Sequence, residues 1–410
     1  MRFIIYCTVL LVFLPKINFI ELPGSSGLRI DDVFIFFLFM LFSAITLLKK
    51  SFLNFLFQFS AFRVVLYILL LSFFSIFLNI DSISFINFLY AIRLLEYSLF
   101  MFIGYYMFKF KFNFEKMVVL YGMLSMIVIL LQYFGIIGGF ALGTYTPDVS
   151  SRPIGLTAGP WEVALLLNYS LVVFAFWNKK NRKNILAFSI LSLIAVSFTG
   201  SRIGLLSMIV IVLILYKQYI IKILSLIIPV TFIFFYILSD SLPVVQRSQT
   251  LFNVNNLIVV MSIYDNVDIT NSLDKSINVN MATTDYDVSW LIRVTKWIYI
   301  IKNNFNDFLH ILIGYSPGYY GPAIDGSYIR IFGELGLLGI VLYFRLLKTM
   351  MINQVMILLM IATLINMIFI DVIYAYKIMS ILFMAYGYYF CKIKNERLKN
   401  GKTVNNNSNL

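Results

Sequence analysis

The residues best placed to do chemistry are carboxylates that stand where apolar segments begin. Asp325 lies in the Gly- and Tyr-rich stretch Gly314–Gly339, before an apolar run that we expect to form an unbroken helix, and Glu162 opens another apolar run. Partial removal from water makes a carboxylate a better proton acceptor near neutral pH. Asp325 and Glu162 are therefore candidates for general acid–base catalysis. Asp325 could instead cap its helix, and Glu162 could be a first-turn acid favoured by the helix dipole.

Arginines stand at comparable positions beside apolar segments. They are Arg152 in SRPIGLTAGPWE, Arg202 in the turn FTGSRIG, Arg293 in a segment of helical Trp and Ile spacing, and Arg330 just inside an apolar run. The guanidinium group is always charged and holds phosphate through paired hydrogen bonds, and a diphosphate needs more than one such group. We therefore predict that these four arginines bind a diphosphate. Each could instead contact a lipid headgroup or a local acid.

Tyrosines crowd the same segments, and Tyr315, Tyr319 and Tyr328 flank Asp325. An aromatic face with a hydroxyl group suits a sugar ring, which presents C–H surfaces and many hydroxyl groups. We predict that these three tyrosines bind sugar. An aromatic belt at a membrane interface would have the same composition.

The chain contains few side chains of the types that usually bind metal ions. A single histidine, His310, excludes a histidine cluster, and two cysteines exclude a zinc or disulfide framework. Asp285 and Asp287 imitate a metal-binding DxD pattern, which loop composition often produces. We expect no metal site and no cofactor.

The composition is that of a membrane protein. The chain has 410 residues, of which 61% are hydrophobic and 12% charged, whereas soluble domains are about 45–50% apolar. The net charge of +13 comes mainly from short Lys and Arg runs between apolar segments. This positive-inside pattern places such runs, and both chain ends, in the cytoplasm, and it does not indicate nucleic-acid binding.

The apolar segments predict an all-α polytopic protein with about twelve transmembrane helices. The predicted spans are 3–20, 33–48, 62–80, 86–108, 117–140, 161–177, 185–200, 203–217, 219–238, 328–347, 351–370 and 372–390. The first is read as a retained span and not as a cleaved signal peptide. Spans one to nine thus occupy 1–238, a large external loop 239–327 contains an interfacial helix near 289–305, spans ten to twelve occupy 328–390, and 391–410 form a cytoplasmic tail.

The order of the motifs resembles that of bacterial O-antigen polymerases and O-antigen ligases. The resemblance rests on SRPIGLTAGPWE, FTGSRIG, TKWIYIIKNNFNDFLHILIGYSPG and DGSYIRIFGELGLLG, which together cover about residues 150–345. Ligases carry a His–polar pair nine residues before G-x-x-G. Here Gly336 and Gly339 match the glycines, but Asp325 and Gly326 stand where the pair belongs, and His310 lies fifteen residues earlier. This departure favours a polymerase.

The resemblance implies a metal-independent, GT-C-like glycosyltransferase in the bacterial inner membrane. Its donor and acceptor would be oligosaccharides linked to undecaprenyl diphosphate, and its surroundings would include membrane lipids, a flippase and a chain-length regulator. The arginines would hold the leaving diphosphate and a carboxylate would accept the proton of the attacking hydroxyl.

Two other functions compete with polymerisation. A ligase would transfer the finished glycan to the lipid A core. A lipid-linked oligosaccharide flippase should have polar residues across several spans and short loops, whereas the spans here carry few charges besides Arg93, Glu96 and Lys377.

Overall fold

The computed structural model is mainly helical. It describes residues 2–14, 18–20, 28–29, 33–38, 40–41, 44, 54–80, 84–139, 151–179, 181–219, 255–270, 273, 288–321 and 324–407. The α-helices are α1 (Arg2–Phe13), α4 (Ser60–Leu78), α5 (Phe85–Ser98), α6 (Phe100–Lys109), α7 (Phe114–Tyr133), α8 (Pro160–Trp177), α9 (Arg182–Phe198), α10 (Arg202–Leu215), α13 (Asn255–Asn266), α15 (Val288–Phe305), α16 (Phe308–Ile313), α17 (Ser327–Met350), α18 (Gln354–Asn366) and α19 (Tyr376–Asn407). Short 3-10 helices are η2 (Lys217–Tyr219) and η4 (Val372–Tyr374), and β1 (Asn18–Ile20) pairs antiparallel with β2 (Leu28–Arg29).

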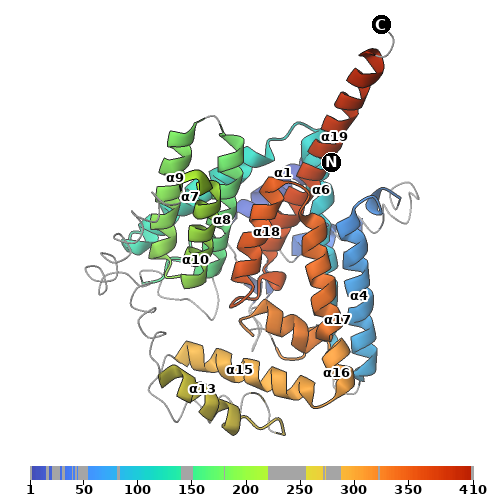
Figure 1. Ribbon diagram of the computed structural model, residues 1–410, viewed down its shortest axis with the longest axis vertical. Helices are drawn as coiled ribbons and strands as arrows, with labels where there is room; N and C mark the ends of the chain where they lie inside the picture. Colours follow the sequence, from blue (N-terminus) through green and yellow to red (C-terminus); the bar gives the residue numbers. More distant parts are fainter. Residues whose placement is uncertain are drawn as a thin grey trace.

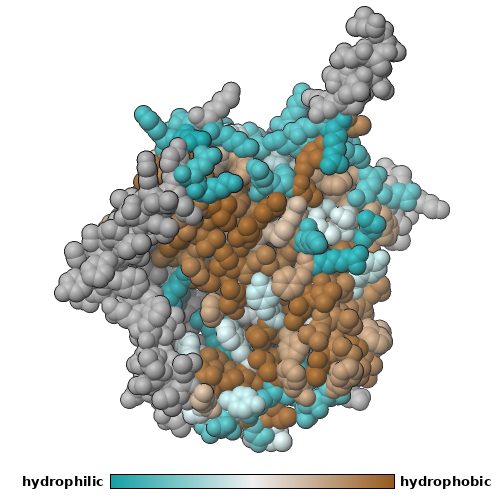
Figure 2. All heavy atoms as spheres, in the orientation of Figure 1, coloured by the Kyte–Doolittle hydropathy of each residue, from teal (hydrophilic) through white to brown (hydrophobic). Residues whose placement is uncertain are grey.

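Within the described residues, four helical stretches are long and apolar enough to cross a membrane. They are Ser60–Leu78, the α5–α6 stretch Phe85–Lys109, Phe114–Tyr133 and Pro160–Trp177, and each coincides with a predicted span. On the face of the molecule drawn in Figure 2, apolar side chains form a broad band with hydrophilic residues at both ends. A surface of this kind is compatible with the apolar interior of a lipid bilayer. The predicted span 219–238 lies outside the described residues, so the total of twelve spans stays a prediction.

The helices form a bundle with two distinct ends. Helices α13, α15 and α16 gather at one end, where α15 lies across the bundle, and the distal part of α19 extends from the other (Figure 1). We call these the α15 end and the α19 end. The helix predicted near 289–305 is confirmed as α15 (Val288–Phe305).

Helices α6 and α19 pack closely against each other. A Cβ atom on Gly104 would lie 1.9 Å from the Met384 carbonyl oxygen, and one on Gly387 would lie 1.8 Å from that of Met101. Glycine at both positions therefore lets the two backbones touch, as small residues do between membrane helices.

The unbroken helix expected over 328–347 is wrong, because α17 is interrupted at Gly336, which has φ 63° and ψ −162°. The break leaves carbonyl groups of α17 without their helical partners, and the loop that follows α16 supplies new donors. Tyr315 N donates to Gly333 O and Ser316 N donates to Glu334 O, both at 3.0 Å. A Cβ atom at Gly336 would lie 2.3 Å from the Leu312 carbonyl carbon. The backbone of the 312–316 segment thus packs directly into the break in α17.

Candidate functional site

A cavity of about 280 Å³ at the α15 end brings together segments that are far apart in the sequence. Three of the four predicted arginines and one predicted carboxylate line it, together with three indole rings. These residues are Arg152, Arg202, Arg293, Asp325, Trp161, Trp290 and Trp297. We call this space the arginine cavity.

Local sequence explains how the arginines reach the cavity. Arg202 is the first residue of α10, after Gly200, whose φ of 65° permits the tight turn from α9. The side chain of Ser201 caps α10 by accepting a hydrogen bond from Gly204 N at 3.4 Å. On α15, Arg293 stands between Trp290 and Trp297, spacings of three and four residues that place all three on one helix face.

Asp325 forms the one ion pair within the cavity lining that the described residues show. Its Oδ2 atom lies 2.9 Å from Nε of Arg293, and the side chains are 43% and 28% exposed. Both charges are thus accessible from the cavity. Asp325 does not cap α17, because the N-cap residue is Gly326 and no side chain caps that end; the capping alternative is wrong.

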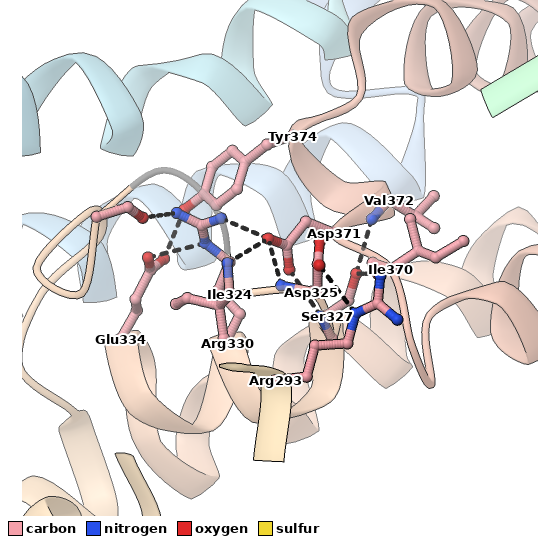
Figure 3. A network of polar contacts seen from close by, with 12 residues as sticks. Arg293, Ile324, Asp325, Ser327, Arg330, Glu334, Ile370, Asp371, Val372 and Tyr374 are labelled. Atoms are coloured by element: carbon pink, nitrogen blue, oxygen red, sulfur yellow. Dashed lines mark hydrogen bonds and ion pairs between the residues drawn. The ribbon is translucent and has the colours of Figure 1, made fainter. Parts of the chain in front are cut away.

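The backbone that presents Asp325 is held by a residue that the sequence analysis missed, Asp371. Its carboxylate accepts hydrogen bonds from the amides of Ile324, Asp325 and Gly326, at 3.0, 3.1 and 3.1 Å (Figure 3). Asp325 has φ +58°, a left-handed conformation that non-glycine residues adopt only at a cost. Three charge-assisted bonds from one carboxylate stabilise that turn. The only sequence signal was a lone acid between two apolar runs, MIFIDVIYAY.

Arg330 lies outside the arginine cavity and is fully buried, with 0% side-chain exposure. Its Nε atom is 3.0 Å from Glu334 Oε1, Nη1 is 2.8 Å from Asp371 Oδ2, and Nη2 donates to Gly321 O at 2.7 Å. Its guanidinium carbon also lies 4.4 Å from the ring centre of Tyr374. Every nitrogen of this guanidinium has a partner in the chain, so the structure does not bring Arg330 to the other three arginines.

Glu162 is also placed away from the cavity. It is 0% exposed, although the preceding residue, Trp161, lines the cavity. Its Oε2 atom accepts a hydrogen bond from Ala158 N at 3.2 Å and so closes the loop before α8, in whose first turn it lies. This contact fits the first-turn interpretation.

The three tyrosines separate into two places, and the described lining of the arginine cavity includes none of them. Tyr315 stacks between His310 and Tyr319, with ring centres 3.8 and 4.9 Å away. Burial raises the pKa of the Tyr315 and Tyr319 hydroxyl groups, which therefore stay neutral. Tyr328 instead donates to Leu364 O at 2.9 Å and stacks on Phe344, between α17 and α18.

His310 is held from both sides of its ring. Nδ1 lies 3.0 Å from Asp307 Oδ2, and Nε2 lies 3.0 Å from Asn79 Oδ1. These contacts and the stacking on Tyr315 fix α16 against the end of α4. His310 thus has a positional role in this structure.

The described residues contain no group of three His, Cys, Asp or Glu side chains that could hold a metal ion. Asp285 and Asp287 lie outside the described residues. The chemistry that the described site offers is binding of a multiply charged anion by guanidinium groups beside a carboxylate that can exchange a proton.

No protein-family model matches the chain, and no curated protein is significantly similar to it. The resemblance to O-antigen polymerases and ligases therefore rests on the motifs of the sequence. The geometry of the arginine cavity is an independent ground on which to argue function.

Proposed function

We propose that this protein is a membrane glycosyltransferase of the GT-C type that polymerises glycan repeat units carried on undecaprenyl diphosphate. The observation that carries the proposal is the arginine cavity, in which Arg152, Arg202 and Arg293 converge with Asp325 from four separate segments. Guanidinium groups clustered around a small space suit a diphosphate, because each binds phosphate oxygens through a planar fork.

In the proposed reaction, a hydroxyl group of the acceptor sugar attacks the anomeric carbon of the donor glycan. A new C–O bond forms as the bond between that carbon and the diphosphate oxygen breaks, and undecaprenyl diphosphate leaves with the bonding electrons. The three arginines stabilise the charge that develops on the leaving group. The hydroxyl proton passes to the Asp325 carboxylate.

The contact between Arg293 and Asp325 gives this scheme a sequence of events. Nε of Arg293 lies 2.9 Å from the Asp325 carboxylate. A diphosphate that binds Arg293 competes for the same guanidinium and frees Asp325 to accept a proton. Binding of the donor would thereby activate the base.

The size of the cavity limits what it can hold. A volume of about 280 Å³ is that of a small-ligand site. It suits the diphosphate and the reacting sugar, so the rest of each glycan would extend outside. Trp161, Trp290 and Trp297 offer apolar faces against sugar C–H groups or the first units of the lipid.

The proposed topology has twelve spans with both termini in the cytoplasm of a bacterial cell. The Lys- and Arg-rich turns then face the cytoplasm and the α15 end faces outward. Repeat units delivered by a flippase would reach the arginine cavity from the outer leaflet, and a chain-length regulator would act on the same face.

The test is a gel of surface polysaccharide from cells that lack the chromosomal copy and express Arg202→Ala. We expect cores that carry a single repeat unit and no ladder of longer chains, with the variant present in the membrane. Lys348→Ala, an exposed lysine outside the cavity, is the matched control and should restore the ladder. Long lipid-linked glycan that never reaches the core would identify a ligase instead. Lipid-linked units trapped in the cytoplasmic leaflet would identify a flippase.

A further inference from the structure

A second hollow lies at the α19 end, far from the arginine cavity. It is a groove of about 600 Å³ between the turn that joins α6 to α7 and the middle of α19. Its lining combines apolar side chains, among them Phe108, Phe112 and Leu398, with the lysines Lys109, Lys111 and Lys394. We call it the lysine groove.

The charge of the lysine groove is of one sign. Lys109, Lys111 and Lys394 line it, and no carboxylate is among the described residues of its lining. The Glu115 carboxylate of α7 is engaged by Lys392, whose Nζ lies 2.9 Å away. The groove thus has the positive potential that attracts an anion.

The position of the groove points to a ligand that is also apolar. Phe85–Lys109 and Phe114–Tyr133 are two of the stretches long and apolar enough to cross a membrane, and the groove opens at the turn between them. Helix α6, which leads into that turn, lies at the α19 end of the bundle (Figure 1), and hydrophilic residues gather at that end of the face drawn in Figure 2. Phe108, Phe112 and Leu398 supply apolar walls beside the lysines.

From these features we infer that the lysine groove binds an anionic phospholipid, with the phosphate of its headgroup against the lysines and an acyl chain along the apolar walls. Basic pockets between membrane helices recognise anionic headgroups in this way. The positive-inside rule alone does not explain why lysines gather in the groove. The same rule places Lys183, Lys217 and Lys348 at helix ends, and the described lining of the groove includes none of these three. The inference does not depend on the proposed enzymatic activity.

The experiment uses the full chain purified in a mild detergent. Thermal stability and lipid retention in native mass spectra are measured after addition of phosphatidylglycerol, phosphatidylcholine or inorganic phosphate. The variant replaces Lys109, Lys111 and Lys394 by Gln, and the matched control replaces the exposed Lys183, Lys217 and Lys348 by Gln. A Lys→Arg version of the first variant keeps the charge and reports whether the groove still folds.

We expect phosphatidylglycerol, but not phosphatidylcholine, to stabilise the wild-type chain. The amount of phosphatidylglycerol retained by the Gln variant should fall by at least about ten-fold, whereas the control and the Lys→Arg variant should retain as much as the wild type. Equal loss in the control would show that general surface charge, and not the groove, attracts the lipid, and would overturn the proposal. An equal response to inorganic phosphate would overturn it too, because the groove would then serve a soluble phosphate ligand.

Discussion

Two arginines on opposite sides of one turn make ion pairs of nearly equal length in very different surroundings. Arg293 lies 2.9 Å from Asp325 with 28% of its side chain exposed, whereas Arg330 lies 2.8 Å from Asp371 with 0% exposed. Removing one partner of a buried pair costs about 3–5 kcal/mol, but an exposed pair contributes only about 0–1 kcal/mol. The buried pair is therefore suited to stability, and the exposed pair is suited to exchange its partner for a ligand.

The two pairs are connected through Asp371. Its carboxylate binds Arg330 and also the amides of the 324–326 turn that carries Asp325 (Figure 3). The buried network thus holds in place the turn that carries Asp325 of the exposed pair. If this division of labour is correct, substitutions in the two networks should separate stability from activity.

The largest effect on stability is expected for Arg330→Met, which keeps the volume of the side chain but removes its charge. Glu334 and Asp371 would be left as carboxylates with 2% and 12% exposure and no guanidinium beside them. The expected loss is about 3–5 kcal/mol of the free energy of unfolding. Thermal unfolding of the purified chain measures it, and Arg293→Met is the matched control, expected to unfold almost like the wild type. Equal losses in both variants would contradict the distinction.

A smaller loss is expected for Asp371→Asn. The amide keeps one oxygen acceptor but loses the charge and the second oxygen, so it cannot satisfy Arg330 and three backbone amides together. Bonds to a charged group contribute about 1.5–3 kcal/mol, which sets the expected loss. Asp307→Asn, at a half-exposed acid, is the control in the same thermal assay. Because the 324–326 turn is held by Asp371, chain elongation should fall as well; an Asp371→Asn protein of wild-type stability would remove Asp371 from its supporting role.

The sequence could predict these features only where the decisive interactions are local. Long apolar runs are sufficient to locate α4, α7 and α8, and the motifs that contain Arg152, Arg202 and Arg293 do meet in one cavity. The sequence could predict that these arginines lie on the same surface, because charged residues beside apolar segments on one membrane side share that surface.

Other features depend on partners that are distant in sequence. The break at Gly336 lies in GELGLLG, which reads locally as helix, and it exists because the backbone of 312–316 occupies that space. Arg330 has the same local signature as Arg293, and only the burial of its partners, including Asp371 forty-one residues away, distinguishes the two. Spacing along the chain does not encode such contacts.

A still smaller effect on stability is expected at Asp325, where backbone and side chain can be tested separately. Its φ of +58° is accessible to glycine without strain but costs alanine about 1 kcal/mol. Asp325→Ala should therefore be less stable than Asp325→Gly by about that amount. Both remove the carboxylate, so both should lack the ladder of long chains on the polysaccharide gel. A normal ladder in the stable Asp325→Gly protein would exclude Asp325 as the base.

The smallest effect on stability, within about 0.5 kcal/mol, is expected for Arg293→Lys. The ammonium group keeps the charge opposite Asp325 at an exposed site, so folding should hardly change. It replaces the planar fork by a point charge, however, and a diphosphate bound across several guanidinium groups depends on that fork. We therefore expect shorter glycan chains at unchanged thermal stability, measured on the same preparations, with Lys296→Arg as the matched control on α15. A full-length ladder would mean that charge alone is required at Arg293. In that case the exposed pair would serve to attract the anion and would not orient it, whereas the geometric demands of the site would fall on Arg152 and Arg202.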